Sequence, residues 1–213
     1  LGEGDLVAVS REALADRPTG RRWTYRQLDD DVSTLARGLL ARGLTKGDRV
    51  GIWSPNGAEW VLVQYATAKI GVILVNVNPA YRAHELTYAI NQSGVSLLVT
   101  AAPSGRSDYP AMVESIREDC PGLAEVVVIG TKSWDALVQG AESVPVEALA
   151  ERADTLSFDD PINIQYTSGT TGFPKGATLS HHNILNNGFF VGELLGYTEE
   201  DRVCVPVPFY HCF

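Results

Sequence analysis

Short apolar runs alternate with longer segments in which apolar residues recur every three or four positions. The short runs are typical of strands buried on both faces, and the longer segments are typical of amphipathic helices. Predicted strands lie at 48–53, 72–77, 95–100 and 125–129, and predicted helices at 25–42, 58–69, 84–92 and 109–119. This alternation predicts an α/β fold of layered, mostly parallel sheets covered by helices.

The first of these helices has clear sequence signals at both ends. Thr24 and Gln27 form a capping-box pattern, in which each side chain can bind the backbone N–H of the other residue. Leu28 and Val32 begin an apolar stripe at helical spacing, and Gly43 can end the helix in a left-handed cap. We therefore expect this helix to be well defined.

The pattern weakens after residue 130 and becomes regular again at Asp160. Two short amphipathic pieces, 133–141 and 147–152, read as a connecting segment and not as a flexible linker. Beyond Asp160 the pattern predicts a strand ending at Tyr166, a return strand, a helix over 182–195 and a strand over 202–207. No internal repeat is visible.

A glycine-rich stretch, Tyr166–Gly176, joins the two strands that follow Asp160. It contains Ser and Thr hydroxyls, three glycines and a lysine. Glycines let backbone N–H groups turn toward one point and let an anion approach closely. Hydroxyls add hydrogen-bond donors, and Lys175 adds a mobile positive charge. The composition of this loop is suited to binding a polyphosphate.

Two better-known phosphate loops do not fit this stretch. A P-loop needs a helix that starts at its lysine, but Pro174 precedes Lys175 and Gly176 follows it. The dinucleotide fingerprint G-x-G-x-x-G is absent, because Gly169 and Gly172 lack the required third glycine. An ordinary glycine-rich hairpin loop is the remaining alternative.

Several motifs together resemble one enzyme superfamily. Tyr166–Gly176 resembles the signature loop of the adenylate-forming enzymes, which include acyl-CoA synthetases, luciferases and peptide-synthetase adenylation domains. Pro208–Phe213 resembles the next core motif of that superfamily, and Ser180–Ile184 also fits. Asn78–Tyr81 and Glu85–Leu86 are similar to the acyl-CoA synthetase branch, including its medium-chain members.

The resemblance implies an ATP-dependent reaction. A carboxylic acid, by this resemblance a fatty acid, would be activated to an acyl-adenylate with release of pyrophosphate and then transferred to CoA. ATP and Mg²⁺ would be the cofactors and CoA a co-substrate, with no metal held by protein side chains alone. Such chemistry needs fixed donors and a cation where negative charge develops. The residues expected to bind the phosphates are Thr167, Ser168, Gly169, Thr170, Thr171, Gly172, Lys175 and Gly176.

Two catalytic residues are expected, Lys175 and His211. His211 stands where the superfamily carries an active-site histidine near the acyl carboxylate and the α-phosphate. We expect it to position and donate, because a carboxylate is already ionised at neutral pH. Tyr210 and Phe213 are the other candidate substrate-binding residues. A lone histidine beside aromatics is ordinarily a packed one, and both aromatics could equally belong to the core.

Composition excludes several other classes of protein. Against 26 acidic residues stand 17 Lys and Arg, for a net charge of −9, which argues against nucleic acid as a partner. No apolar run is long enough to span a membrane. Three cysteines without a CxxC pair indicate a reducing compartment, so we expect a cytoplasmic location and no structural zinc. His181 and His182 are adjacent at a predicted helix start, where neighbouring side chains point in different directions. We therefore do not expect them to bind one metal ion together.

The resemblance also implies that residues 1–213 are the N-terminal portion of a large AMP-binding domain. The adenine-binding motifs and a mobile C-terminal domain with a catalytic lysine would follow Phe213. We expect this piece to fold, to be inactive alone and to self-associate. Alternative functions are a fatty-acyl-AMP ligase, a carrier-loading adenylation domain, a non-catalytic nucleotide-binding module and a plain structural domain.

Overall fold

The structure is a computed structural model that describes residues 10–105, 107–167 and 174–211. In chain order its elements are β1 (Glu12–Asp16), β2 (Arg21–Thr24), α2 (Tyr25–Ala41), β3 (Arg49–Trp53), α3 (Ala58–Lys69), β4 (Ile73–Asn76), α4 (Ala83–Ser93), β5 (Leu97–Thr100), α5 (Tyr109–Ser115), β6 (Glu125–Val128), α6 (Lys132–Gln139), η1 (Gly140–Ser143), α7 (Glu147–Ala153), β7 (Pro161–Thr167), β8 (Lys175–Ser180) and α8 (His181–Leu195).

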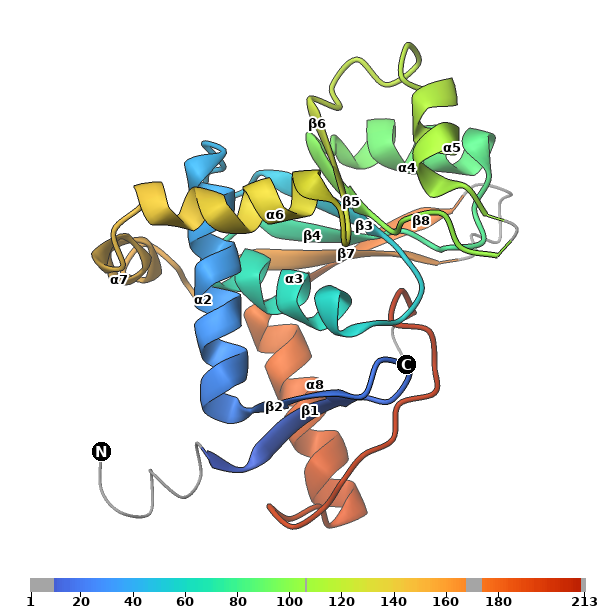
Figure 1. Cartoon of the computed structure of the whole chain (residues 1–213). Helices are drawn as coiled ribbons and strands as arrows, with labels where there is room; N and C mark the ends of the chain where they lie inside the picture. Colours follow the sequence, from blue (N-terminus) through green and yellow to red (C-terminus); the bar gives the residue numbers. More distant parts are fainter. Residues whose placement is uncertain (1–9, 106, 168–173, 212–213) are drawn as a thin grey trace.

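A six-stranded sheet forms the centre of the molecule (Figure 1). Its strand order is β6-β5-β3-β4-β7-β8, and all neighbours are parallel except β7 and β8, which form an antiparallel pair. The central strands are buried on both faces, as their continuous apolar sequences predict. The predicted α/β fold with a mostly parallel, doubly covered sheet is confirmed.

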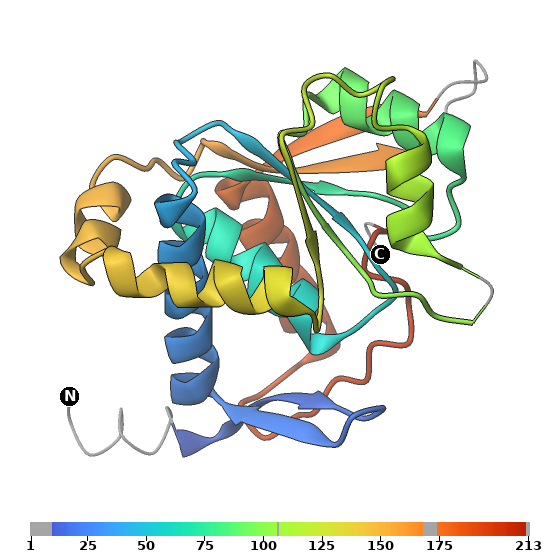
Figure 2. The ribbon, with the colours of Figure 1, turned by 45° about the horizontal axis from the view of Figure 1, so that its top comes forward.

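Two separate apolar clusters cover the two faces of this sheet. One cluster packs α2, α3 and Leu137 of α6 against β3 and β4. The other packs α4 and α5 against the opposite face, with Leu86 and Val113 among its members. Figure 2 shows α2, α3 and α6 on one side of the strands and α4 and α5 on the other. The strand ends are therefore the parts of the sheet left for a site.

The start of α2 confirms the capping-box prediction. The N–H of Gln27 donates to Thr24 Oγ1 at 3.2 Å, and the N–H of Thr24 donates to Gln27 Oε1 at 2.9 Å. One glycine inside α2 has a packing role. A Cβ at Gly38 would lie 2.2 Å from the carbonyl oxygen of Leu137, so only glycine allows α6 to approach this closely.

Three parts of the chain differ from the sequence-based expectation. Strands β1 and β2 form an antiparallel hairpin that the apolar pattern does not indicate, because both strands are short and rich in charged residues. The helix predicted at 109–119 ends at Ser115. The predicted strand at 202–207 is wrong: these residues form no strand pairing, and Val203 and Val205 are more than half exposed.

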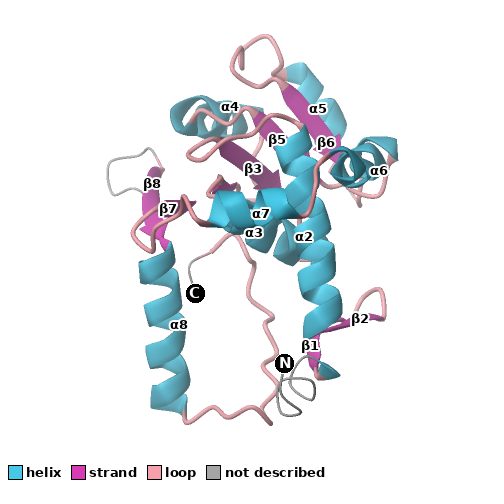
Figure 3. Ribbon diagram, turned by 90° about the vertical axis from the view of Figure 1, so that its left-hand side faces the viewer, coloured by secondary structure: helices cyan, strands magenta, loops and turns pink. Residues whose placement is uncertain are grey.

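Helix α8 and the segment after it lie apart from the core. The helix extends away from the sheet, and the chain then runs back toward the carboxyl ends of the strands (Figure 3). Arg11 beside β1 binds this returning segment, donating to the carbonyl of Glu199 at 3.2 Å and pairing with Glu200 at 3.2 Å. Within the described ranges, no residue after Tyr166 is buried. The predicted substrate residues Tyr210 and His211 thus belong to a segment that lies largely outside the core.

Candidate active site

Strands β7 and β8 hold the ends of the glycine-rich loop. Thr167 and Lys175 are the last cross-strand pair before the loop, and Thr167 Oγ1 donates to the carbonyl of Lys175 at 3.4 Å. Because β7 runs parallel to β4, β7 leads into the loop at the end of the sheet where the parallel strands have their carboxyl ends. The predicted phosphate-binding residues Ser168, Gly169, Thr170, Thr171 and Gly172 lie outside the described residues.

Lys175 presents an exposed charge at the base of this loop. Its side chain takes part in no hydrogen bond or ion pair with the residues at 10–105, 107–167 and 174–211. Thr167, opposite it, is also exposed. An ammonium group and a hydroxyl therefore stand on neighbouring strands where the loop begins and ends. Both groups can serve an anion.

Gly176 and buried Tyr166 form the next cross-strand pair below Thr167 and Lys175. Gly176 lies opposite Tyr166 in the strand register, and a Cβ on Gly176 would come within 2.9 Å of the Ile164 side chain. The Tyr166 hydroxyl donates to the carbonyl of Ala89 at 3.1 Å, and burial raises its pKa. Tyr166 is a packing residue, and Gly176 lets β8 fit closely against Ile164 of β7.

Helix α4 holds the far end of the loop. The Tyr88 hydroxyl donates to the carbonyl of Pro174 at 3.3 Å, and Gln92 Nε2 donates to the same hydroxyl at 2.6 Å. This contact joins residues far apart in the chain, and no local motif in the sequence marks it. The described residues on either side of the loop are thus held by β7, β8 and α4.

The second predicted segment lies at the same edge of the sheet. The Phe209 ring packs edge-on against Trp60 of α3, with ring centroids 6.3 Å apart. The N–H of His211 donates to the carbonyl of Pro208 at 3.1 Å and closes a turn. Phe209 also binds Asn56, which follows the carboxyl end of β3, so this segment lies at the end of the parallel strands at which β7 ends.

His211 and Tyr210 have different surroundings. The imidazole of His211 is exposed and meets the Tyr210 ring edge-on, at 6.2 Å between centroids. His211 is therefore not a histidine packed in the core, which is the ordinary role of a lone histidine beside aromatic residues. Tyr210 is half-buried and packs against the cluster under α2 and α3. Phe213, the third predicted substrate residue, lies outside the described residues.

The turn after β4 comes close to Tyr210. Burial, with the carboxylate of Glu85 and the phenol of Tyr210 as further causes, raises the pKa of Tyr81. The N–H of Tyr81 donates to the carbonyl of Asn78 at 2.9 Å, which closes this turn. The structure therefore brings Tyr81 and Tyr210, which belong to two motifs distant in sequence, close to each other.

The other described histidines and cysteines lie apart from these segments or have partners of their own. His182 Nδ1 lies 3.2 Å from Asp159 Oδ1, whereas His181 is half-buried and burial lowers its pKa, with Asp160 opposing this. Cys120 is buried, which raises its pKa, and Cys204 is exposed. In the described part of the chain, no three His, Cys, Asp or Glu side chains are grouped so that they could hold a metal ion.

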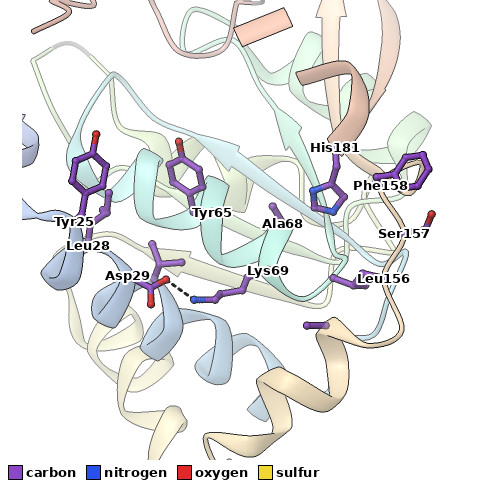
Figure 4. Close-up of a pocket in the computed structure, with 12 residues that line it drawn as sticks. Tyr25, Leu28, Asp29, Tyr65, Ala68, Lys69, Leu156, Ser157, Phe158 and His181 are labelled. Atoms are coloured by element: carbon purple, nitrogen blue, oxygen red, sulfur yellow. Dashed lines mark hydrogen bonds and ion pairs between the residues drawn. The ribbon is translucent and has the colours of Figure 1, made fainter. Parts of the chain in front are cut away.

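A broad apolar groove lies at the opposite end of the strands, near the amino ends of β4 and β7 (Figure 4). It measures about 720 Å³ and contains the ion pair between Lys69 Nζ and Asp29 Oδ1 at 2.6 Å. None of the predicted site residues lines it. The residues that do are Tyr25, Leu28, Asp29, Val32, Tyr65, Ala68, Lys69, Ala153, Leu156, Ser157, Phe158 and His181.

Comparison with known proteins places these features in a family. The family model described as AMP-binding enzyme matches residues 4–213. The chain belongs to the AMP-binding enzyme family. Among curated relatives, the medium-chain acyl-CoA ligase ACSF2, mitochondrial, of Danio rerio is 43% identical over 225 residues. The acyl-CoA ligase SID4 of Ajellomyces capsulatus is 41% identical over 213 residues.

The match is nearly complete for this chain and partial for its relatives. It covers 95% of this chain with each of these two ligases, but 37% and 36% of their respective lengths. Among solved structures, the inhibitor-bound N-terminal domain of FACL13 from Mycobacterium tuberculosis superposes with a TM-score of 0.82 at 28% identity. That match covers 97% of this chain and 49% of the other. The resemblance to the acyl-CoA synthetase branch is confirmed.

The search for membrane-spanning segments in the described residues found none. Every described helix is too short or too polar to cross a bilayer.

Proposed function

We propose that the protein activates a hydrophobic, fatty carboxylic acid with ATP and transfers the acyl group to CoA. The carboxylate would attack the α-phosphorus of ATP, forming an acyl-adenylate and releasing pyrophosphate. The thiol of CoA would then attack the acyl carbon, forming the thioester and releasing AMP. The names of the relatives, which are acyl-CoA ligases, support this reaction.

The observation that carries the proposal is the placement of Lys175. Its ammonium is exposed beside Thr167 at the base of a loop of Ser, Thr and Gly residues, and both strands are held firmly below it. A flexible cation beside hydroxyls and open backbone suits the β- and γ-phosphates of ATP. In this proposal Thr167, Ser168, Thr170 and Thr171 donate to those phosphates, and Gly169, Gly172 and Gly176 give the backbone its shape.

The second part of the proposal concerns Tyr210 and His211. The exposed imidazole would donate to the acid carboxylate or to the α-phosphate, and Tyr210 and Phe213 would line the entrance for the acyl chain. Mg²⁺ would enter bound to the phosphates of ATP, the way this ion is usually held in such sites. The described side chains offer no group of three ligands for it.

Two kinds of alternative function can be distinguished by their products. A fatty-acyl-AMP ligase or a carrier-loading domain would form the adenylate but not the CoA thioester. A non-catalytic nucleotide-binding module would bind ATP without any exchange of pyrophosphate. Protection of the Lys175 peptide bond against trypsin by ATP would separate all of these from a plain structural domain.

The decisive test is Lys175→Ala in the full-length protein, measured by acid-dependent ATP–pyrophosphate exchange. Losing one fixed contact to developing charge typically lowers a rate by about 10²–10³-fold, and we expect a loss of that order. The urea midpoint should not change, because the Lys175 side chain has no partner among the described residues. Unchanged exchange in the folded variant would remove the loop from the mechanism.

Lys132 offers a matched control. It is an exposed lysine at the first position of α6, just after β6, and three strands separate β6 from β7, so Lys132→Ala should leave the exchange unchanged. Running the same assay with fatty, aryl and amino acids tests the acid class. A clear preference for an amino acid would contradict the fatty-acid part of the proposal.

Partners and location remain predictions. ATP, the acid and CoA are the proposed partners, and the net charge of −9 disfavours nucleic acid. Self-association of the 213-residue chain is supported by the exposed apolar side chains of α8. The cytoplasmic location rests on cysteine usage alone, and one of the compared relatives carries the word mitochondrial in its name.

A further inference from the structure

The segment that carries Tyr210 and His211 has no regular secondary structure, yet its backbone is fixed at defined points. Asn56 follows β3 at the carboxyl edge of the sheet. Its Nδ2 donates to the carbonyl of Val207 at 2.8 Å, and its Oδ1 accepts from the N–H of Phe209 at 2.8 Å. One side-chain amide thus binds two backbone groups that lie just before the proposed substrate residues.

A second asparagine binds the same backbone from the neighbouring strand. Asn76 is the last residue of β4 and is 2% exposed. Its Nδ2 lies 3.4 Å from the carbonyl oxygen of Phe209, and its Oδ1 accepts from Nδ2 of buried Asn163 at 3.2 Å. Buried amides need such partners, because an unpaired one loses its hydration without compensation.

The side chain of Phe209 is anchored as well. Its ring contacts Trp60, which belongs to the core cluster under α3. Residue 209 is therefore held through its N–H by the turn after β3, through its carbonyl by β4 and through its ring by α3. Tyr210 and His211 follow it directly, so the position of Phe209 sets theirs.

A local structural role does not explain the Asn56 side chain. Asparagine before a helix often caps it, but the N-cap of α3 is Gly57, which receives no side-chain cap bond. Asn56 is also exposed, so its replacement leaves the core intact. The task at this position requires one donor and one acceptor at fixed spacing, which an amide provides and a carboxylate does not.

We propose that Asn56 is a positioning residue for the acid-activation step. Through the backbone of Val207 and Phe209 it holds Tyr210 and His211 at the carboxyl edge of the sheet, where the β7–β8 loop begins. The proposal rests on the proposed function for its catalytic part, but the clamp itself can be tested without any reaction.

The structural test is hydrogen exchange of the 207–211 backbone in the full-length protein. In Asn56→Ala the amide of Phe209 should exchange about tenfold faster, because its hydrogen bond to Asn56 Oδ1 is lost. The control is Asn91→Ala, whose Nδ2 donates to the carbonyl of Asp119 at 2.8 Å on the α4–α5 side. That variant should leave exchange at 207–211 unchanged. Unaltered exchange in Asn56→Ala would overturn the inference whatever the protein catalyses.

The functional test uses Asn56→Ala and the isosteric Asn56→Asp. We expect kcat for acid-dependent pyrophosphate exchange to fall about tenfold or more, since small misplacements of catalytic groups are costly. KM for ATP should change little, because the proposed contacts to the β- and γ-phosphates lie on the β7–β8 loop and not on the segment that Asn56 holds. Asn56→Asp should be as impaired as Asn56→Ala, since the donor to Val207 is lost. A fully active Asn56→Asp would overturn the amide role.

The two proposals can fail separately. If Lys175→Ala abolishes exchange while both Asn56 variants keep normal kcat, the positioning role is wrong and the proposed function stands. If Lys175→Ala has no effect, the proposed function fails, and the hydrogen-exchange result still decides whether Asn56 holds the segment. Faster exchange at Phe209 together with lower kcat and an unchanged KM for ATP supports the inference.

Discussion

Helices α3 and α8 share one property and differ in another. Both carry apolar residues on several sides, a pattern typical of helices buried all round. Helix α3 fits this rule, with Trp60 and Val63 inside the main core cluster. Helix α8 has no buried residue, and Leu194 on it is 86% exposed. The pattern therefore predicts the helix correctly but does not say what covers it.

Both helices contribute residues to the apolar groove described above. Tyr65 and Lys69 of α3 line one side of it, and His181, the first residue of α8, lines another (Figure 4). The other side of α3 packs against the sheet and α2. No residue of α8 is buried in this way. The two helices can be compared with substitutions of the same residue type.

The largest difference is expected for a leucine on each helix. Leu62 on α3 is 8% exposed, and Leu185 on α8 is 73% exposed. Leu62→Ala should lower the free energy of unfolding by about 2–5 kcal/mol, the usual cost of a buried leucine-to-alanine change. Leu185→Ala should change it by less than about 0.5 kcal/mol. Urea denaturation of the 213-residue chain measures both, and equal losses would mean that α8 is packed in solution.

A smaller effect is expected on self-association. Phe190 and Leu194 lie one turn apart on α8, 60% and 86% exposed. If their exposed surface drives association of the 213-residue chain, replacing both with lysine should lower the apparent mass in light scattering by at least half. Tyr65→Lys on α3, which changes a 57% exposed side chain, is the control. A chain that is monomeric before any substitution would contradict the prediction.

Local signals in the sequence predicted the elements well where the interactions are local. The capping box at Thr24 involves a neighbour three positions away, and the start of α2 agrees with it. The apolar runs predicted four parallel strands because burial on both faces leaves no polar alternation. In the same way, the pattern predicts a strand that ends at Tyr166, and β7 ends one residue later, at Thr167.

The failures concern interactions between distant residues. Alternating Val203 and Val205 suggested a strand, but a strand needs a neighbour to pair with, and the segment has none among the described residues. The amide of Asn56 binds backbone more than 150 positions away, which no local pattern encodes. A partial signal existed in Asn76, a polar residue at the end of an otherwise apolar strand.

The smallest expected effect is a pH dependence at the junction of the two helices. His181 begins α8 and lines the groove beside α3. Burial lowers its pKa below the usual value near 6.5, and the carboxylate of Asp160 opposes this only in part. Above pH 6.5 the imidazole is neutral in both the folded and the unfolded chain, so it makes no difference to stability. Below pH 6.5 the unfolded chain takes up the proton first, and the folded state loses stability until its own pKa is passed.

Urea midpoints at pH 7.5 and pH 5.5 isolate this contribution. Asp160 and Asp201 have lowered pKa values, Asp160 chiefly through its hydrogen bond with Lys46 and Asp201 through the backbone of Thr198. Their stabilisation is present above about pH 3.9 and is lost only as pH falls further, so it does not change across this interval. The chain should therefore be less stable at pH 5.5, and His181→Gln should reduce the difference. His84→Gln on the exposed side of α4 should leave the difference as it is. An equal pH dependence with and without His181 would show that the start of α8 opens to water, and that its one partly buried end is as uncovered as the rest of the helix.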